Sequence, residues 1–82
     1  MPVSLLLIED NEDILANLYA YLEPLGYELD CARHGRTGLS MALEGRFDCI
    51  VLDVMLPGKN GLEVLRALRA ERVSTPVLML SA

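Results

Sequence analysis

The sequence predicts an α/β protein in which four strands of a parallel sheet alternate with three helices. Apolar runs of about five residues, rich in Leu, Ile and Val, are typical of strands that are buried on both faces. Between them lie longer segments in which apolar residues recur every three or four positions, as on the buried face of a helix. The resulting order is βαβαβαβ, and no linker, repeat or low-complexity segment interrupts it. This alternation favours right-handed crossovers between parallel strands.

The first strand is predicted over residues 4–8 and the first helix over residues 12–25. Pro24 removes a hydrogen bond from the last turn of this helix, so we expect the end to fray or kink. Gly26 then suits the left-handed conformation that often follows a helix.

Residues 27–33 alternate apolar and polar side chains, which predicts a half-exposed strand at an edge of the sheet. Gly35 opens the second helix and Gly45 ends it. The residues expected to face the core from this helix are Leu39, Ala42 and Leu43.

The third strand is predicted over residues 48–52, directly before Asp53, and a turn-rich loop occupies residues 57–61. The third helix follows and ends near Glu71, and the fourth strand spans residues 76–80. The predicted buried stripe of the third helix consists of Leu62, Leu65 and Leu68.

The composition limits the class of protein. The 82 residues allow one small domain, but a hydrophobic fraction of 52% and a mean hydropathy of +0.33 are high for so short a chain. We therefore expect the chain to be part of a larger domain. A net charge of −5 argues against nucleic acid as a direct partner, because phosphate backbones are bound by clustered Lys and Arg. No apolar run approaches the ~20 residues of a membrane span, so we expect a cytoplasmic protein with no membrane partner.

Acidic or hydroxyl side chains follow three of the predicted strands. They are Glu9 and Asp10 after the first, Asp53 after the third and Ser81 after the fourth. In open parallel sheets, ligands bind at the carboxyl ends of the strands, where the strand order reverses. If the first strand lies between the second and the third, Asp10 and Asp53 face each other across that crevice.

These three carboxylates predict a site for a divalent cation. Repulsion among Glu9, Asp10 and Asp53 would raise at least one pKa unless a cation intervenes. Mg²⁺ prefers carboxylates and water, and it often keeps a place for phosphate oxygens. A carboxylate beside Mg²⁺ can act as a nucleophile towards a phosphoryl group and form an aspartyl phosphate. Ser81 could donate a hydrogen bond to a phosphoryl oxygen.

The motifs that carry a family resemblance occur in a fixed order. They are Glu9-Asp10, the run 50–58 with its Pro57-Gly58 turn, Gly61, and Leu80-Ser81-Ala82. In order and spacing they resemble the receiver domain of two-component response regulators, over the whole chain. The resemblance implies a flavodoxin-like fold with strand order 2-1-3-4-5. It also implies a phosphoacceptor, not a turnover enzyme, that takes its phosphoryl group from a sensor histidine kinase.

The same resemblance implies a role for each site residue. Asp53 would be the phosphoacceptor. Mg²⁺ would be held by Asp10, Asp53 and the backbone carbonyl of Met55, with Glu9 supporting it through water or through Asp10. Ser81 would be the hydroxyl residue that follows the phosphoryl group when such domains switch.

Family members continue beyond the part that this chain matches. They have another helix, a fifth strand with an essential Lys and a final helix. Lys59 does not match that Lys and is expected to be a solvated turn residue. We therefore expect residues 1–82 to be the N-terminal portion of a receiver domain, with strand order 2-1-3-4 and no output domain. Contact with DNA would require such an output domain. We predict that the isolated chain binds Mg²⁺ weakly, is phosphorylated poorly and self-associates as a dimer or exchanged oligomer through its exposed fourth strand, 77–80.

Two other functions and several purely structural roles remain open. The chain could be an interaction or assembly module that is not phosphorylated. It could also be an aspartate-nucleophile phosphatase of the haloacid dehalogenase type, although such enzymes need a second Asp where this chain has Met55. Asp10 and Asn11 could merely cap a helix, and Asp53 could merely begin a turn. His34 is expected to be an exposed loop residue.

Overall fold

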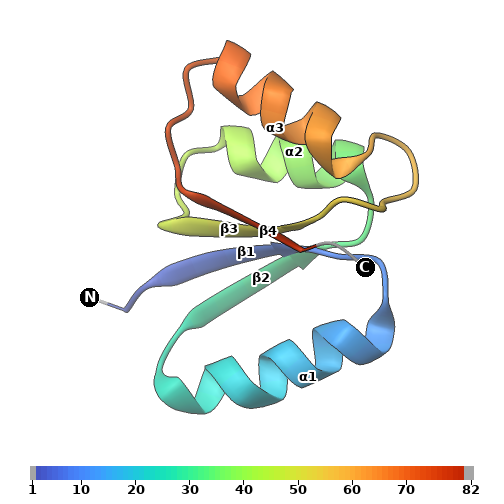
Figure 1. Ribbon diagram of the computed structural model, residues 1–82. Helices are drawn as coiled ribbons and strands as arrows, with labels where there is room; N and C mark the ends of the chain where they lie inside the picture. The colour runs from blue at the N-terminus through green and yellow to red at the C-terminus, as the bar shows by residue number, and fades with distance from the viewer. Residues whose placement is uncertain (1, 81–82) are drawn as a thin grey trace.

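The computed structural model describes residues 2–80, which form a four-stranded parallel sheet with helices on both faces (Figure 1). The strands are β1 (Ser4–Ile8), β2 (Glu28–Ala32), β3 (Cys49–Asp53) and β4 (Val77–Leu80). The helices are α1 (Glu12–Leu22), α2 (Gly35–Leu43) and α3 (Gly61–Ala70), with a short 3₁₀ helix, η1 (Glu23–Leu25), after α1. The strand order is β2-β1-β3-β4, as predicted, so β1 and β3 are central.

The sheet separates two apolar layers. Helix α1 covers one face, while α2 and α3 lie on the other (Figure 1). Because side chains alternate along a strand, Leu6 and Ile8 of β1 enter the core beneath α2 and α3, whereas Leu5 and Leu7 pack on the α1 side. Leu6, Leu7 and Ile8 are fully buried. Burial of each such side chain stabilises the fold by roughly 1.5–3 kcal/mol.

Helix α1 begins and ends where the sequence indicates a change of backbone. The side chain of Asn11 accepts a hydrogen bond from the backbone N–H of Ile14 at 3.0 Å, which caps the first turn. The predicted helix of residues 12–25 ends as an α-helix at Leu22, and its last turn tightens into η1, which contains Pro24. Gly26 then adopts a φ of 94°, which confirms the predicted left-handed turn.

The predicted inward faces of α2 and α3 are partly wrong. Leu43 is 41% exposed and Leu62 is 46% exposed. Ala42 and Leu68 are buried, as predicted, and the other buried residues of these helices are Gly35, Gly38, Gly61 and Val64. The physical reason is close approach, because a Cβ atom on Gly38 would lie only 2.7 Å from the side chain of Ile8. Glycines form these close contacts, and Leu62, which follows Gly61, is exposed.

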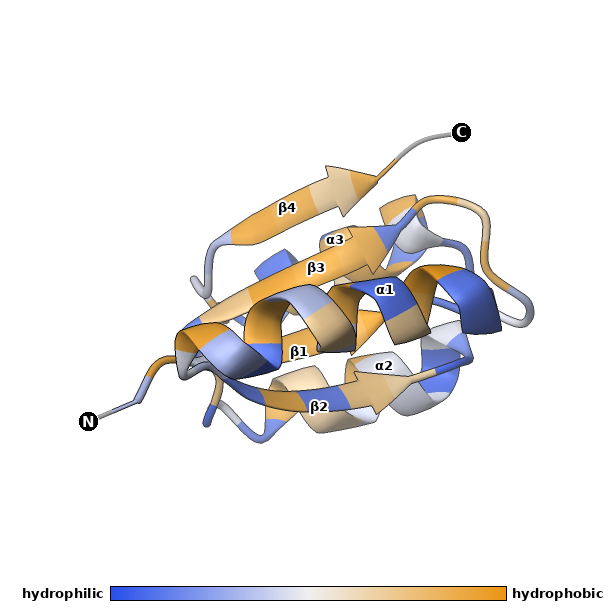
Figure 2. Cartoon of the chain, turned by 90° about the horizontal axis from the view of Figure 1, so that it is seen from below, coloured by the Kyte–Doolittle hydropathy of each residue, from blue (hydrophilic) through white to orange (hydrophobic). Residues whose placement is uncertain are grey.

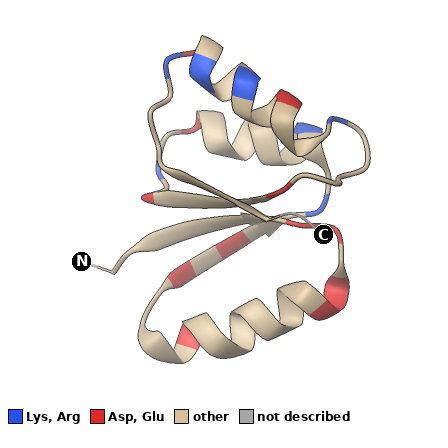
Figure 3. Ribbon diagram, in the orientation of Figure 1, with Lys and Arg blue, Asp and Glu red and all other residues tan. Residues whose placement is uncertain are grey.

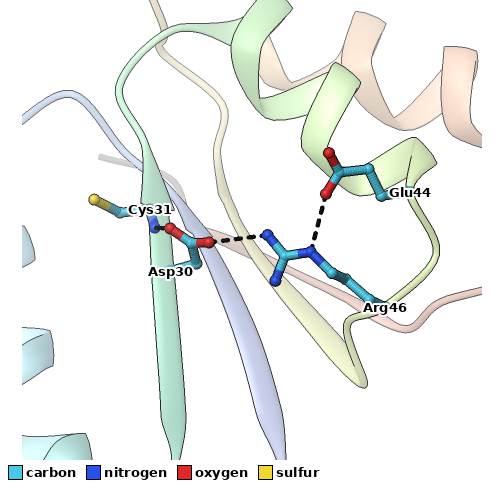
Figure 4. Close-up of polar contacts among 4 residues, drawn as sticks. All are labelled: Asp30, Cys31, Glu44 and Arg46. Atoms are coloured by element: carbon cyan, nitrogen blue, oxygen red, sulfur yellow. Dashed lines mark hydrogen bonds and ion pairs between the residues drawn. The ribbon is translucent and has the colours of Figure 1, made fainter.

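Both edges of the sheet are partly open to solvent. The edge strand β2 is half-exposed, as predicted, and Arg46 links its Asp30 to Glu44, which follows α2 (Figure 4). The two ion-pair distances are 3.0 Å to Asp30 and 2.9 Å to Glu44, and the Arg46 guanidinium lies 4.3 Å from the centre of the Phe47 ring. The other edge strand, β4, exposes Leu78 to 59%. One edge therefore carries an exposed ion-pair network, while the opposite edge is apolar.

Charge is distributed unevenly between the two layers. Figure 3 shows Lys and Arg on the side of α2 and α3, whereas α1 and β2 carry only acidic charges. None of the helices formed by residues 2–80 is both long enough and apolar enough to cross a bilayer.

Candidate metal centre

The carboxyl ends of β1 and β3 lie side by side. Ile8 of β1 is paired with Leu52 of β3, so the residues that follow them emerge at the same edge of the sheet. One carboxylate oxygen from each of Glu9, Asp10 and Asp53 lies within 4.8 Å of the other two. These residues line an open hollow of about 440 Å³ whose apolar rim is formed by Ile14, Met55 and Leu80. The expectation that Asp10 and Asp53 would face each other agrees with this geometry.

Glu9 is the buried member of the cluster. Only 3% of its surface is exposed, and its carboxylate accepts a hydrogen bond from the backbone N–H of Asn11 at 3.1 Å. Burial raises the pKa of Glu9 above the ordinary value of 4.5, and the neighbouring Asp53 and Asp10 raise it further, while the Asn11 hydrogen bond partly opposes the shift. The cluster therefore carries an electrostatic penalty that a bound cation would relieve.

Asp53 is oriented by the loop that follows it. As the last residue of β3, it is half-buried, and its Oδ1 accepts a hydrogen bond from the backbone N–H of Met55 at 3.1 Å. The N–H of Val54 donates to the carbonyl of Leu80 at 3.0 Å, which ties this corner to β4. One carboxylate oxygen of Asp53 is thus held by the backbone of the loop that follows it.

Glycine allows α3 to begin directly against this corner. A Cβ atom on Gly61 would overlap the carbonyl oxygen of Asp53 and lie 2.8 Å from the Cα atom of Val54. The N–H of Gly61 also donates to the carbonyl of Val54 at 2.9 Å. Gly58 has a φ of 80°, a left-handed turn that favours glycine. The loop residues selected from the sequence therefore shape the backbone around Asp53.

Asp10 is exposed and is contacted from the end of β2. A guanidinium nitrogen of Arg33, Nη2, donates to the backbone carbonyl of Asp10 at 3.3 Å, and Nη1 pairs with Glu12 at 3.0 Å. Sequence reasoning did not identify Arg33 as a neighbour of the site. No local pattern could have done so, because the contact depends on the pairing of β1 with β2.

Three further sequence predictions concern residues near this edge. Ser81 lies outside the described residues. His34 is exposed, as expected, and precedes α2 without capping it through its side chain. Lys59 lies in the loop, as expected, and is partly exposed, with its backbone against Gly35 at the start of α2.

The donor atoms suit a hard divalent cation. Within residues 2–80, three carboxylates converge here and no nitrogen or sulfur ligand joins them, which is the chemistry that Mg²⁺, Ca²⁺ and Mn²⁺ favour. The hollow is open, so water could complete a coordination shell. Among the described residues, Glu9, Asp10 and Asp53 therefore form a group that fits an oxygen-coordinated cation.

Comparison with known proteins connects this geometry to a family. A family model described as "Response regulator receiver domain" matches residues 5–82. The transcriptional regulatory protein TcrA of Mycobacterium tuberculosis is 44% identical over 80 residues, which cover 98% of this chain and 32% of TcrA. The uncharacterized transcriptional regulatory protein YkoG of Bacillus subtilis is 46% identical over 78 residues, covering 95% of this chain and 34% of YkoG. The chain thus spans about a third of the length of these curated relatives.

Solved structures with a similar fold include two receiver domains. The receiver domain of the sensor histidine kinase PA1611 from Pseudomonas aeruginosa, solved with a magnesium ion coordinated in the active site cleft, superimposes with a TM-score of 0.93 at 30% identity. That comparison covers 100% of this chain and 69% of the solved chain. The receiver domain of the Francisella response regulator 1452 gives a TM-score of 0.93 at 30% identity, over 98% of this chain and 66% of the solved chain.

Proposed function

Because this chain belongs to the family of response regulator receiver domains, we propose that it accepts a phosphoryl group on Asp53 in the presence of Mg²⁺. The observation that carries the proposal is the convergence of the Glu9, Asp10 and Asp53 carboxylates at the carboxyl ends of β1 and β3. The magnesium ion in the cleft of the PA1611 receiver domain supports the choice of cation.

We propose a role for each residue of the site. Asp10 and Asp53 would hold Mg²⁺ directly, together with the backbone carbonyl of Met55. Glu9 is buried, so it would support the cation indirectly, through water or through Asp10. Mg²⁺, when bound, supplies positive charge that offsets the charge on a transferred phosphoryl group. Pro57, Gly58 and Gly61 set the path of the loop that carries Met55.

The chemical step is a displacement at phosphorus by Asp53. Its Oδ1 is held by the N–H of Met55, so Oδ2 would be the oxygen that attacks the phosphorus atom. A P–O bond to Asp53 forms while the bond from phosphorus to the donor nitrogen of a phosphohistidine breaks, and the imidazole leaves with that electron pair. The phosphoryl group stays on Asp53 at the end of this step, so the chain would act as a signalling module and not as a turnover enzyme.

The partners of the whole protein follow from the family. We propose that residues 1–82 form the N-terminal portion of a receiver domain, which takes its phosphoryl group from a sensor histidine kinase in the cytoplasm. Relatives such as TcrA are named as transcriptional regulatory proteins, which favours a DNA-binding output domain elsewhere in the full-length protein. Ser81 would contact the phosphoryl group on switching. Self-association through β4 stays a prediction.

The test is phosphorylation by a small phosphodonor such as acetyl phosphate, with Mg²⁺ present and then removed by a chelator. We expect the intact mass of the full-length protein to rise by one phosphoryl group. The rise should disappear with the chelator and in the Asp53→Asn variant, and it should persist in Asp13→Asn, an exposed aspartate in the first turn of α1. Labelling of Asp53→Asn equal to wild type would exclude Asp53 as the acceptor.

The isolated 82 residues should label more slowly than the full-length protein. In the described part of the chain, no lysine is placed at a fifth strand to offset the three carboxylates. Mg²⁺ alone leaves about one negative charge uncompensated. Equally rapid labelling of both proteins would contradict this expectation and would show that residues 1–82 are a sufficient acceptor.

A further inference from the structure

The loop between Asp53 and Gly61 is held in place by a residue from another element. Gly35, the first residue of α2, is buried and donates its N–H to the carbonyl of Pro57 at 3.2 Å. The loop therefore touches α2 near its midpoint. Met55, which lies between this contact and Asp53, donates the hydrogen bond that orients the Asp53 carboxylate.

Gly35 leaves no space for a side chain. A Cβ atom built there would overlap the carbonyl oxygen of Lys59 and would lie 2.6 Å from its carbonyl carbon. Those atoms are backbone, so the overlap could be relieved only if the loop moved away from α2. Gly35 does not have a positive φ, unlike Gly26, Gly45 and Gly58. The absent side chain, and not an unusual backbone conformation, is what this position requires.

The far end of the loop is held by Gly61. Its N–H donates to the carbonyl of Val54, and it also leaves no space for a Cβ atom. The loop is thus fixed at Asp53 by β3, at Pro57 and Lys59 by Gly35, and at its end by Gly61. A displacement at the middle contact is therefore shared between the Lys59–Gly61 side and the segment between Asp53 and Pro57, which contains Met55.

We propose that Gly35 is a positioning residue for Asp53: its missing side chain lets the Pro57–Lys59 backbone dock on α2, and this docking fixes the Met55 backbone beside the Asp53 carboxylate. The proposal rests on the function proposed above for Asp53. Ligand sites depend on positions held to about 0.5 Å, and loss of a supporting contact typically weakens metal binding 10–100-fold.

A purely local role for Gly35 predicts the opposite outcome. Alanine is the better helix former, so Gly35→Ala would stabilise α2 if the space beside it were free. It would then leave Mg²⁺ affinity unchanged. The two explanations therefore differ in a binding measurement and not only in stability.

The experiment compares Gly35→Ala with Gly45→Ala in the full-length protein, by titrating Mg²⁺ and following backbone amide shifts by NMR. Gly45 has a φ of 75° and no atom within 4 Å of its Cβ position, so alanine there strains the backbone without touching the loop. We expect Gly35→Ala to raise the Mg²⁺ dissociation constant at least tenfold and Gly45→Ala to change it less than twofold. Wild-type affinity in Gly35→Ala would overturn the proposal.

The metal-free spectra separate this inference from the proposed function. Gly35→Ala should shift the amide resonances of Met55 and Asn60 before any Mg²⁺ is added, and Gly45→Ala should not. If wild type binds no Mg²⁺ at this cluster, the proposed function fails while the metal-free shifts still decide the role of Gly35. If the shifts are absent, the role of Gly35 is refuted even though wild type binds Mg²⁺.

Hydrogen exchange of the wild-type chain covers the case in which Gly35→Ala does not fold. If docking on Gly35 fixes the Asp53 corner, the amides of Gly35 and Met55 open in the same event and share one opening free energy. Met55 protection that outlasts opening at Gly35 would show that the Asp53 corner is held without α2, and it would overturn the proposal.

Discussion

Glu9 is the buried carboxylate of the site, which makes its negatively charged form energetically unfavourable. Among residues 2–80 it is the charged side chain that the fold buries, with 3% of its surface exposed. Its carboxylate also faces those of Asp10 and Asp53. Burial of a carboxylate favours its protonated form, which is why the pKa of Glu9 is raised.

The first residue-scale prediction concerns the pH dependence of stability in metal-free buffer. Because the pKa of Glu9 is higher in the folded state than in the unfolded state, the folded state binds its proton more tightly. The contribution of this proton to the free energy of unfolding is fully present below the ordinary pKa of 4.5, and it is lost as pH rises through the folded-state pKa. Glutamine does not ionise, so in Glu9→Gln the stability should not fall as pH rises through this range. We expect the variant to raise the free energy of unfolding at pH 7 by on the order of 1 kcal/mol.

Urea denaturation at a series of pH values between 4 and 8 measures this effect, and Glu28→Gln on exposed β2 is the matched control. Addition of Mg²⁺ should stabilise wild type more than Glu9→Gln, because the cation offsets the charge that the variant lacks. Parallel stability curves for wild type and Glu9→Gln would refute a raised pKa at Glu9.

The three carboxylates could be identified from sequence because their placement depends on one rule of parallel sheets. All carboxyl ends meet at one edge, so acids at the ends of two adjacent strands are neighbours, and the family resemblance supplied the strand order that makes these two strands adjacent. Arg33 and Gly35 could not be identified in this way. Arg33 reaches Asp10 only through the β1–β2 pairing, and the contact of Gly35 depends on how closely a loop approaches a helix.

At the scale of single elements, α3 has a well-formed start and a strained end. At its start, Asn60 and Glu63 form a capping box, in which each side chain accepts a hydrogen bond from the backbone N–H of the other residue. At its end, Val73 donates to the carbonyl of Leu68 across Arg72, whose φ is 61°. This is a Schellman turn with a non-glycine residue in the left-handed position, which costs roughly 1–2 kcal/mol.

We therefore predict that Arg72→Gly stabilises the chain. Glycine adopts the left-handed conformation without a steric penalty, so the expected gain is about 1 kcal/mol, or about 4–8 °C in the melting temperature. The control is Arg66→Gly within α3, where glycine should destabilise by about 1 kcal/mol. Circular dichroism melts of the two variants should shift in opposite directions, and a fall in melting temperature for Arg72→Gly would contradict the assignment of strain.

The element boundaries were more predictable than the helix faces. Strong local signals mark the boundaries, such as the proline that tightens η1 and the glycine that follows it. The inward faces of α2 and α3 were partly wrong because a search for apolar side chains passes over glycine. Gly35, Gly38 and Gly61 leave no space for a Cβ atom where these helices pack, and contact of that kind leaves no hydrophobic pattern in the sequence.

At the scale of the whole molecule, the two faces of the sheet are covered unequally. Figure 2, which looks onto the α1 face, shows α1 crossing the middle of the sheet and leaving β4 without a helix in front of it. An apolar hollow of about 530 Å³ lies beside α1 on this face. Its lining residues are Val3, Leu5, Leu18, Tyr21, Leu22, Tyr27, Cys49, Val51, Leu78 and Leu80. Exposed apolar surface next to an open strand edge favours association.

The last prediction is that the 82-residue chain self-associates through this face and through β4. Leu78 is 59% exposed on the edge strand, so Leu78→Lys places a charge where a second strand would pair or pack. We expect sedimentation equilibrium to give a weight-average mass above that of the monomer for wild type at about 100 μM, and a mass nearer the monomer for Leu78→Lys. Leu43→Lys is the matched control, because Leu43 is also exposed, at 41%, but lies in α2 on the opposite face of the sheet. A monomeric wild type at this concentration would refute self-association, and an equal effect of both variants would show that net charge, and not the β4 edge, governs it.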